Sequence, residues 1–281
     1  MLFLILAALS STLIAVIMRL AETKITSRMG MFAANYALCA LLSAAFSGFS
    51  GVKAAGEGAD TALLLGGISG VLYLACFMLY RLCILKNGVA VSSTFMKLGV
   101  IIPTCTAIWI FGEQVLPARA AGLVLAAAAI LVFQYEKGGL HGYGLKSALL
   151  LPALLFLSGI TDGMANLYSR LGTAGAKDLY LLFTFVMALV LSVLLCLAEK
   201  KKPRASDLLW GALIGLPNYF SSRFLLLSLS SLPATLVYPT YSVGTVLLSC
   251  AAGMLLFKEK LTPRKWIAMA IIAAALVLLS M

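Results

Sequence analysis

The chain has 281 residues, of which 62% are hydrophobic and 11% are charged, and its formal net charge is +11. An ordinary soluble domain is about one quarter charged, so the composition excludes a soluble globular protein. The basic residues lie in short segments between apolar stretches, without a basic domain interleaved with aromatics, which argues against a nucleic-acid partner.

Ten apolar stretches follow one another along the chain, each near the roughly 20 residues that a helix needs to cross a bilayer. Backbone polar groups in lipid must be hydrogen-bonded internally, and uniform hydrophobicity over such lengths favours helices over the strands of a barrel. We therefore predict an all-α membrane protein, multi-pass in the plasma or inner membrane of a prokaryote, whose first stretch is a persistent span and not a signal peptide. The ten predicted spans are 2–20, 30–49, 61–84, 88–111, 117–135, 145–168, 179–198, 207–228, 232–256 and 264–280.

The basic residues are distributed unevenly between the predicted loops. The loops after the odd-numbered spans contain fifteen Lys and Arg residues, including the KKKPR cluster at 200–204, whereas the loops after the even-numbered spans contain four. The positive-inside bias therefore places the odd loops in the cytoplasm and both termini outside.

Residues 111–133 (FGEQVLPARAAGLVLAAAAILVF) and 257–279 (FKEKLTPRKWIAMAIIAAALVLL) share the spacing F-x-E-x-x-x-P at an offset of 146 residues. The same offset pairs Tyr73 with Tyr219. Two five-span repeats, 1–138 and 139–281, are predicted, and an odd number of spans per repeat forces the second into the membrane inverted. Inverted repeats are common in secondary transporters, which bind substrate near the bilayer midplane. Glu113 and Glu259 lie at the ends of spans, each four residues before a proline, and a structural role in the turn is favoured over a direct role in substrate binding.

This arrangement resembles the drug/metabolite transporter superfamily, in its EamA-like branch. The resemblance rests on the five-plus-five duplication, on Gly112-Glu113 and Lys258-Glu259 closing equivalent spans, and on Arg19 near the end of the first span. Asn35 stands where members often have an arginine. The resemblance implies a transporter of amino acids, nucleotide sugars, cations, phosphorylated sugars or other metabolites. It also implies cytoplasmic termini, opposite to the charge bias, and both orientations stay open.

Three charged residues, Asp162, Lys97 and Arg223, lie deep in predicted spans. A charge at mid-bilayer costs about 2.5–3.5 kcal/mol on insertion scales, and such residues are functional candidates by default. A structural ion pair between Asp162 and either cation is the alternative. Ser158, Asp162 and Asn166 recur every four residues, so we expect one polar stripe facing the interior. The Gly159 and Gly163 pair in that span predicts helix packing.

The predicted function is secondary active transport of a small polar metabolite that is amino-acid-like, bears a carboxylate or phosphate, or is zwitterionic. Alternating access is expected, with proton coupling through Asp162. The alternatives are a membrane scaffold or accessory subunit held by structural ion pairs and, with less support, a lipid-modifying enzyme. Either a monomer or a homodimer is compatible with ten spans. No catalytic residue, cofactor or metal is predicted, and the six cysteines, all in apolar spans, suit packing. The predicted substrate-binding residues are Lys97, Asp162, Asn166, Arg223, Tyr73, Tyr219, Asn218, Tyr241 and Thr94.

Overall fold

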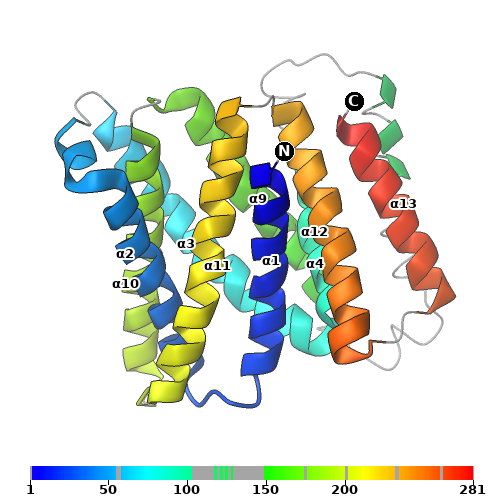
Figure 1. Cartoon of the computed structure of the whole chain (residues 1–281), viewed down its shortest axis with the longest axis horizontal. Coiled ribbons are helices and arrows are strands. Elements are labelled where there is room, and N and C mark those ends of the chain that lie inside the picture. The colour runs from blue at the N-terminus through cyan, green and yellow to red at the C-terminus, as the bar shows by residue number, and fades with distance from the viewer. Residues whose placement is uncertain are drawn as a thin grey trace. The chain divides into compact units, whose positions relative to one another are not determined.

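The computed structural model describes residues 2–54, 58–102, 149–173, 176–199, 202–231, 234–259 and 262–280, with isolated positions between 117 and 128. The predicted span 117–135, the later part of the span 88–111 and Glu113 thus lie largely or wholly outside the described residues. Every regular element of the described chain is a helix. The helices are α1 (Leu2–Ala21), α2 (Arg28–Ala54), α3 (Ala59–Asn87), α4 (Val89–Leu98), α9 (Leu150–Leu171), α10 (Lys177–Ala198), α11 (Ala205–Ser231), α12 (Ala234–Phe257) and α13 (Pro263–Ser280) (Figure 1).

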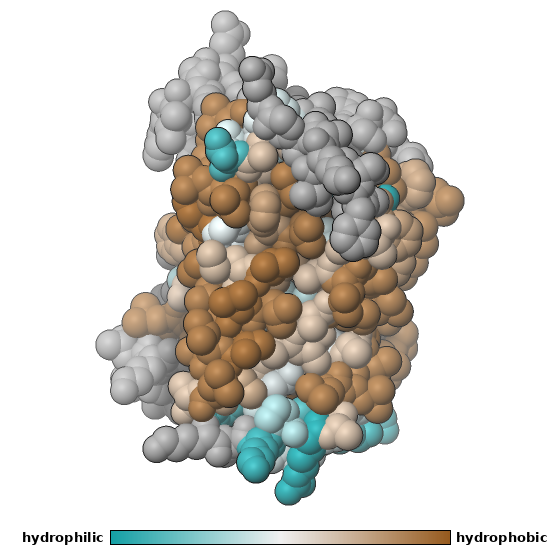
Figure 2. Space-filling view, turned by 90° about the vertical axis from the view of Figure 1, so that its left-hand side faces the viewer, coloured by the Kyte–Doolittle hydropathy of each residue, from teal (hydrophilic) through white to brown (hydrophobic). Residues whose placement is uncertain are grey.

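Five of the described helical stretches are long and apolar enough to cross a membrane, namely Leu2–Ala21, Arg28–Phe46, Ala59–Asn87, Lys177–Ala198 and Thr240–Phe257. The stretch in α10 is the most hydrophobic, with a mean hydropathy of 2.8, and only 28% of it is buried. On the face of the molecule that includes α10, hydrophobic side chains cover the middle, and hydrophilic ones gather at one end (Figure 2). This distribution suits helices whose outer faces meet lipid, so the chain is an all-α membrane protein.

The helices group into two compact units, each built from both halves of the sequence. The first unit comprises Met1–Val16, Leu79–Ile160 and Ser221–Met281, and the second comprises Ile17–Met78 and Thr161–Phe220. In the first unit α4 packs against α12, and α13 packs against both, whereas in the second unit α2 packs along α10 (Figure 1). These packed pairs position the residues discussed below.

Glycine pairs create two close helix crossings in the second unit. A Cβ added at Gly66 of α3 would lie 2.9 Å from the Tyr180 carbonyl oxygen of α10, and one added at Gly215 of α11 would lie 2.7 Å from the Asn35 carbonyl oxygen of α2. Gly70 and Gly211 complete the two Gly-x-x-x-Gly pairs, and their missing side chains likewise face backbone carbonyls. Only glycine permits such an approach of two helices. Gly159 makes a similar contact with Gly99 in the first unit, whereas an added Cβ at Gly163, in the second unit, would meet open space. The predicted packing is therefore confirmed for Gly159 only.

Two carboxylates cap α2 in the second unit. Asp207 accepts hydrogen bonds from the backbone N–H groups of Thr26 (2.7 Å) and Ser27 (3.1 Å). Glu199, directly after α10, accepts a hydrogen bond from the Ser27 hydroxyl at 3.0 Å. The first N–H groups of a helix have no partner within the helix and carry a partial positive charge, which a carboxylate stabilises. The start of α2 is therefore held at the end of α10, and the two helices run antiparallel.

Glu259 has the equivalent role in the first unit. Its carboxylate accepts hydrogen bonds from the N–H groups of Val89 (2.7 Å) and Ala90 (3.2 Å), the first residues of α4. Lys258 has a left-handed φ of 51° and the Glu259 N–H donates to the Gly253 carbonyl at 3.0 Å, so the chain turns back at the end of α12. The predicted structural role of Glu259 is confirmed, and α4 and α12 also run antiparallel.

Replacing Glu259 by alanine should destabilise the protein, because the first N–H groups of α4 then lose their acceptor. Loss of a helix cap costs typically about 1 kcal/mol, and a lower thermal unfolding midpoint in detergent would report it. Asp60→Ala, which removes an exposed carboxylate in the first turn of α3, is the matched control and should change the midpoint less. Equal shifts for both variants would contradict the capping role.

Candidate functional site

A buried lysine of α4 faces a tyrosine of α12 in the first unit. Lys97 lies in the last turn of α4 and is 7% exposed. Its Nζ lies 3.9 Å from the centroid of the Tyr241 ring. An ammonium group over an aromatic face gains a cation–π interaction, which is stronger away from water. The antiparallel packing of α4 and α12 brings together two residues that are 144 positions apart.

Hydroxyl groups surround the polar end of Tyr241. Its hydroxyl lies 3.1 Å from Ser221 Oγ, and Ser221 Oγ donates to the Ala7 carbonyl oxygen at 3.3 Å. Because Ser221 has one hydroxyl hydrogen and a carbonyl only accepts, Tyr241 is the donor in its bond with Ser221. Ser11 is a further buried hydroxyl close to Tyr241. We call Ser11, Lys97, Ser221 and Tyr241 the lysine cluster.

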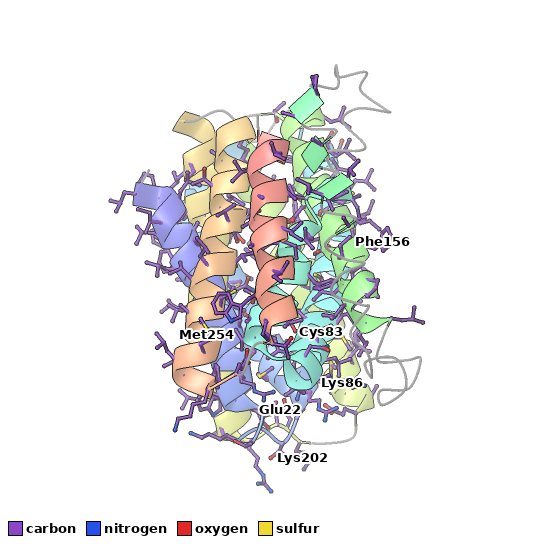
Figure 3. The ribbon with its side chains drawn as sticks, turned by 90° about the vertical axis from the view of Figure 1, so that its right-hand side faces the viewer. Glu22, Cys83, Lys86, Phe156, Lys202 and Met254 are labelled. Atoms are coloured by element: carbon purple, nitrogen blue, oxygen red, sulfur yellow. The ribbon has the colours of Figure 1, made fainter. Side chains whose placement is uncertain are left out.

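Two other predicted residues belong to the first unit. Thr94, one turn before Lys97, is fully buried and donates its hydroxyl to the Ala90 carbonyl at 2.7 Å. The Thr94 hydrogen is thus already used within α4, although its oxygen can still accept. Arg223 of α11 is half-buried. Figure 3 shows the side chains of this part of the chain, including Cys83 and Lys86 near the end of α3.

The predicted tyrosine pair lies in the second unit and contacts one shared ring. The Phe185 centroid of α10 is 6.1 Å from that of Tyr73 and 6.5 Å from that of Tyr219. Both distances suit edge-to-face or tilted aromatic contacts. Tyr219 is 1% exposed and also stacks on Phe46 at 5.7 Å. We call Tyr73, Phe185 and Tyr219 the tyrosine cluster.

Asn218, next to Tyr219, forms a side-chain hydrogen bond with Asn35 of α2. Its Nδ2 donates to Asn35 Oδ1 at 3.3 Å, and both side chains are buried. The Asn35 Nδ2 has no hydrogen-bond partner among the described residues. An unsatisfied buried donor is costly, so this amide is available to a polar group that enters the second unit.

The residues of the predicted polar stripe of α9 differ in burial. Ser158 is 2% exposed and donates to the Met96 carbonyl at 2.8 Å. Asp162 is exposed, close enough to Tyr180 to act on it electrostatically. The expected burial of Asp162 is therefore not found, because a spacing of four residues advances about 40° around a helix at each step and the stripe leaves the packed face. The Asn166 side chain lies outside the described residues.

Ser11, Ser221 and Phe185 were not predicted as site residues. Phe185 carries no polar group, and serines recur throughout these spans, so composition alone does not single them out. The offset of 146 residues does not indicate Ser11 either, because it pairs Ser11 with Leu157. No group of three potential metal ligands occurs in the part of the chain that the structure describes.

Comparisons with known proteins fit this architecture. The profile of the Small Multidrug Resistance protein family matches residues 179–272, the stretch from α10 into α13. An uncharacterized protein of Haemophilus influenzae is 25% identical over 274 residues, which cover 94% of this chain and 92% of that protein. A crystal structure of another protein aligns with 99% of this chain and 94% of that one, at a TM-score of 0.65 and 15% identity, and supports the fold. The family match and the apolar helices indicate a multi-pass membrane transporter of small molecules.

Proposed function

We propose that the protein is a secondary active transporter that binds a small anionic or zwitterionic solute through the lysine cluster. The observation that carries the proposal is the buried Lys97 ammonium, whose neighbour in the described part of the first unit is the Tyr241 ring. Cation–π attraction offsets only part of the cost of burying a charge. A carboxylate or phosphate on the solute would supply the missing charge, and the hydroxyls of Ser11 and Ser221 would supply neighbouring hydrogen bonds.

The inverted duplication is the second part of the proposal. Equivalent helices begin 145 to 149 residues apart, as in α3 with α11 and α4 with α12. The packed pairs α2 with α10 and α4 with α12 are each a helix with its own counterpart, in antiparallel orientation. Two helices related by a twofold axis perpendicular to them pack against each other in antiparallel orientation when both lie close to that axis. Inverted repeats of this type support alternating access.

The glycine crossings support the same duplication. Gly66 and Gly70 of α3 face the carbonyls of Tyr180 and Thr184, and Gly211 and Gly215 of α11 face those of Met31 and Asn35. Both sets of partners are four residues apart, and each glycine of α11 follows its counterpart in α3 by 145 positions. The α3–α10 contact is therefore repeated as the α11–α2 contact, a feature that composition alone does not produce.

A thermal-shift screen of the purified protein tests the substrate class. Carboxylates, phosphosugars and amino acids should raise the unfolding midpoint of the native protein, and uptake of the best solute into proteoliposomes should follow. Stabilisation by quaternary amines alone would contradict an anion-binding Lys97. A protein that no solute stabilises and that carries none would favour a scaffold.

Proton coupling through Asp162 is the remaining part of the proposal. In Asp162→Asn, uptake driven by a pH gradient should fall to the rate without a gradient, because an amide cannot take up and release the proton, while solute exchange at equal pH should persist. Asp178→Asn, in the first turn of α10, is the control and should keep its gradient dependence. Unaltered coupling in Asp162→Asn would remove this residue from the mechanism.

A further inference from the structure

We propose that the second unit carries a binding site for the phosphate of an anionic phospholipid headgroup, formed by Lys24, Arg28, Lys202 and Arg204. All four side chains are exposed. They come from two segments, the turn between α1 and α2 and the segment that leads into α11. This site is separate from the lysine cluster and does not depend on the proposed transport function.

Contacts of the backbone bring the two segments together. The Arg204 N–H donates to Asp207 Oδ2 at 2.8 Å, and the same carboxylate accepts from Thr26 and Ser27. The Pro203 ring packs against the first turn of α2, where a Cβ added at Gly30 would lie 2.6 Å from the Pro203 Cβ. Lys202 and Arg204 are therefore held beside the start of α2, which Arg28 begins.

Two of the three carboxylates of this region are bonded to the backbone. Asp207 is fully buried, and its two oxygens accept three backbone N–H groups. Glu199 is bonded to the Ser27 hydroxyl and the Met29 N–H, at 3.0 and 3.4 Å. Glu22, half-buried at the same end of the unit as Lys202 (Figure 3), is the other carboxylate of these segments. Asp207 also lies close enough to Arg204 to act on it electrostatically, but the four exposed cations outnumber the three carboxylates of these segments and present a net positive surface.

The surroundings of the four cations fit a lipid better than free phosphate. Lys24 Nζ lies 5.1 Å from the centroid of the Trp210 ring, and tryptophan is enriched at membrane–water interfaces. Leu208 and Leu209, in the first turn of α11, are 48% and 61% exposed. Apolar side chains thus begin within one helical turn of the basic ones. A phospholipid could place its phosphate on the cations and its acyl chains along the exposed leucines.

Lipid binding by the full chain tests this site. The double variant Lys202→Gln/Arg204→Gln is compared with Lys86→Gln/Lys258→Gln, which removes the same charge from exposed positions of the first unit. Binding of phosphatidylglycerol and phosphatidylcholine is measured by native mass spectrometry and by thermal shift in detergent. A cation near an anionic surface contributes enough binding energy that losing two should weaken phosphatidylglycerol binding about 30-fold. The control and phosphatidylcholine binding should change little.

Three results would overturn the proposal. Equal loss in both double variants would mean that only total charge matters. Equal binding of phosphatidylglycerol and phosphatidylcholine by the unaltered protein would mean that no anionic headgroup is recognised. Stabilisation by inorganic phosphate as large as that by phosphatidylglycerol would mean that the acyl chains contribute nothing. Lys24→Gln, which also removes the contact with Trp210, gives an independent variant that should weaken phosphatidylglycerol binding.

Discussion

Replacing Lys97 by glutamine should abolish most solute binding while leaving the fold intact. A hydrogen bond to a charged group contributes about 1.5–3 kcal/mol, so the affinity for an anionic solute should fall by roughly 10- to 150-fold. Thermal stability in the absence of solute should stay the same or rise, because removing an incompletely compensated buried charge also removes its desolvation cost. Loss of binding without loss of stability distinguishes a solute-binding lysine from a structural one.

Two further variants sharpen this test. Tyr241→Phe keeps the ring under the Lys97 ammonium but removes the hydroxyl that bonds Ser221, so it should reduce affinity less than Lys97→Gln does. Lys86→Gln, at an exposed position in the last turn of α3, is the matched control and should bind solute as the native protein does. The midpoint of thermal unfolding with and without solute measures all three. A destabilised Lys97→Gln variant with unchanged solute affinity would assign Lys97 to structure.

The sequence predicts the helices well because hydrophobicity over about 20 residues is a strong and local signal. Eight of the ten predicted spans overlap described helices almost throughout, whereas the two five-span repeats stay a prediction. The predicted orientation stays a prediction. Helix pairing was less predictable, because it depends on close contacts such as those at Gly66 and Gly215. The sequence around these glycines differs little from that around glycines that pack loosely.

Some contacts of the candidate site follow the sequence prediction, and its substrate-binding role stays a prediction. Lys97 with Tyr241, and Tyr73 with Tyr219, were singled out by charge or by symmetry, and the structure joins each pair by a direct contact or through one shared ring. Their connecting residues were missed, because serine and phenylalanine are common in these spans. Asp162 was expected to be buried and is exposed. The pattern of a single helix does not show which part of its length neighbouring helices cover, so this difference could not be predicted. Burial is a property of the assembled helices and not of one helix's pattern.

Alanine at Gly66 or Gly211 should destabilise the protein, and by similar amounts. A Cβ at Gly66 would lie 2.9 Å from the Tyr180 carbonyl oxygen, and one at Gly211 would lie 2.7 Å from the Ala34 Cβ. Both contacts are shorter than a Cβ tolerates, so the helices must separate. Overpacking of this kind costs typically about 1–3 kcal/mol. The midpoint of thermal unfolding in detergent should fall in both variants, because each glycine faces a backbone carbonyl of the neighbouring helix.

Gly67→Ala is the matched control, one residue along the same helix. Its added Cβ would meet the Met187 Cε at 3.6 Å, an ordinary contact with the end of a flexible side chain. Alanine is also the better helix former, by about 1 kcal/mol, so this variant should be as stable as the native protein or more so. If Gly66→Ala destabilised the protein and Gly211→Ala did not, the two crossings would not be equivalent. The structural support for a duplicated architecture would then rest on the positions at which the helices begin and on antiparallel pairing alone.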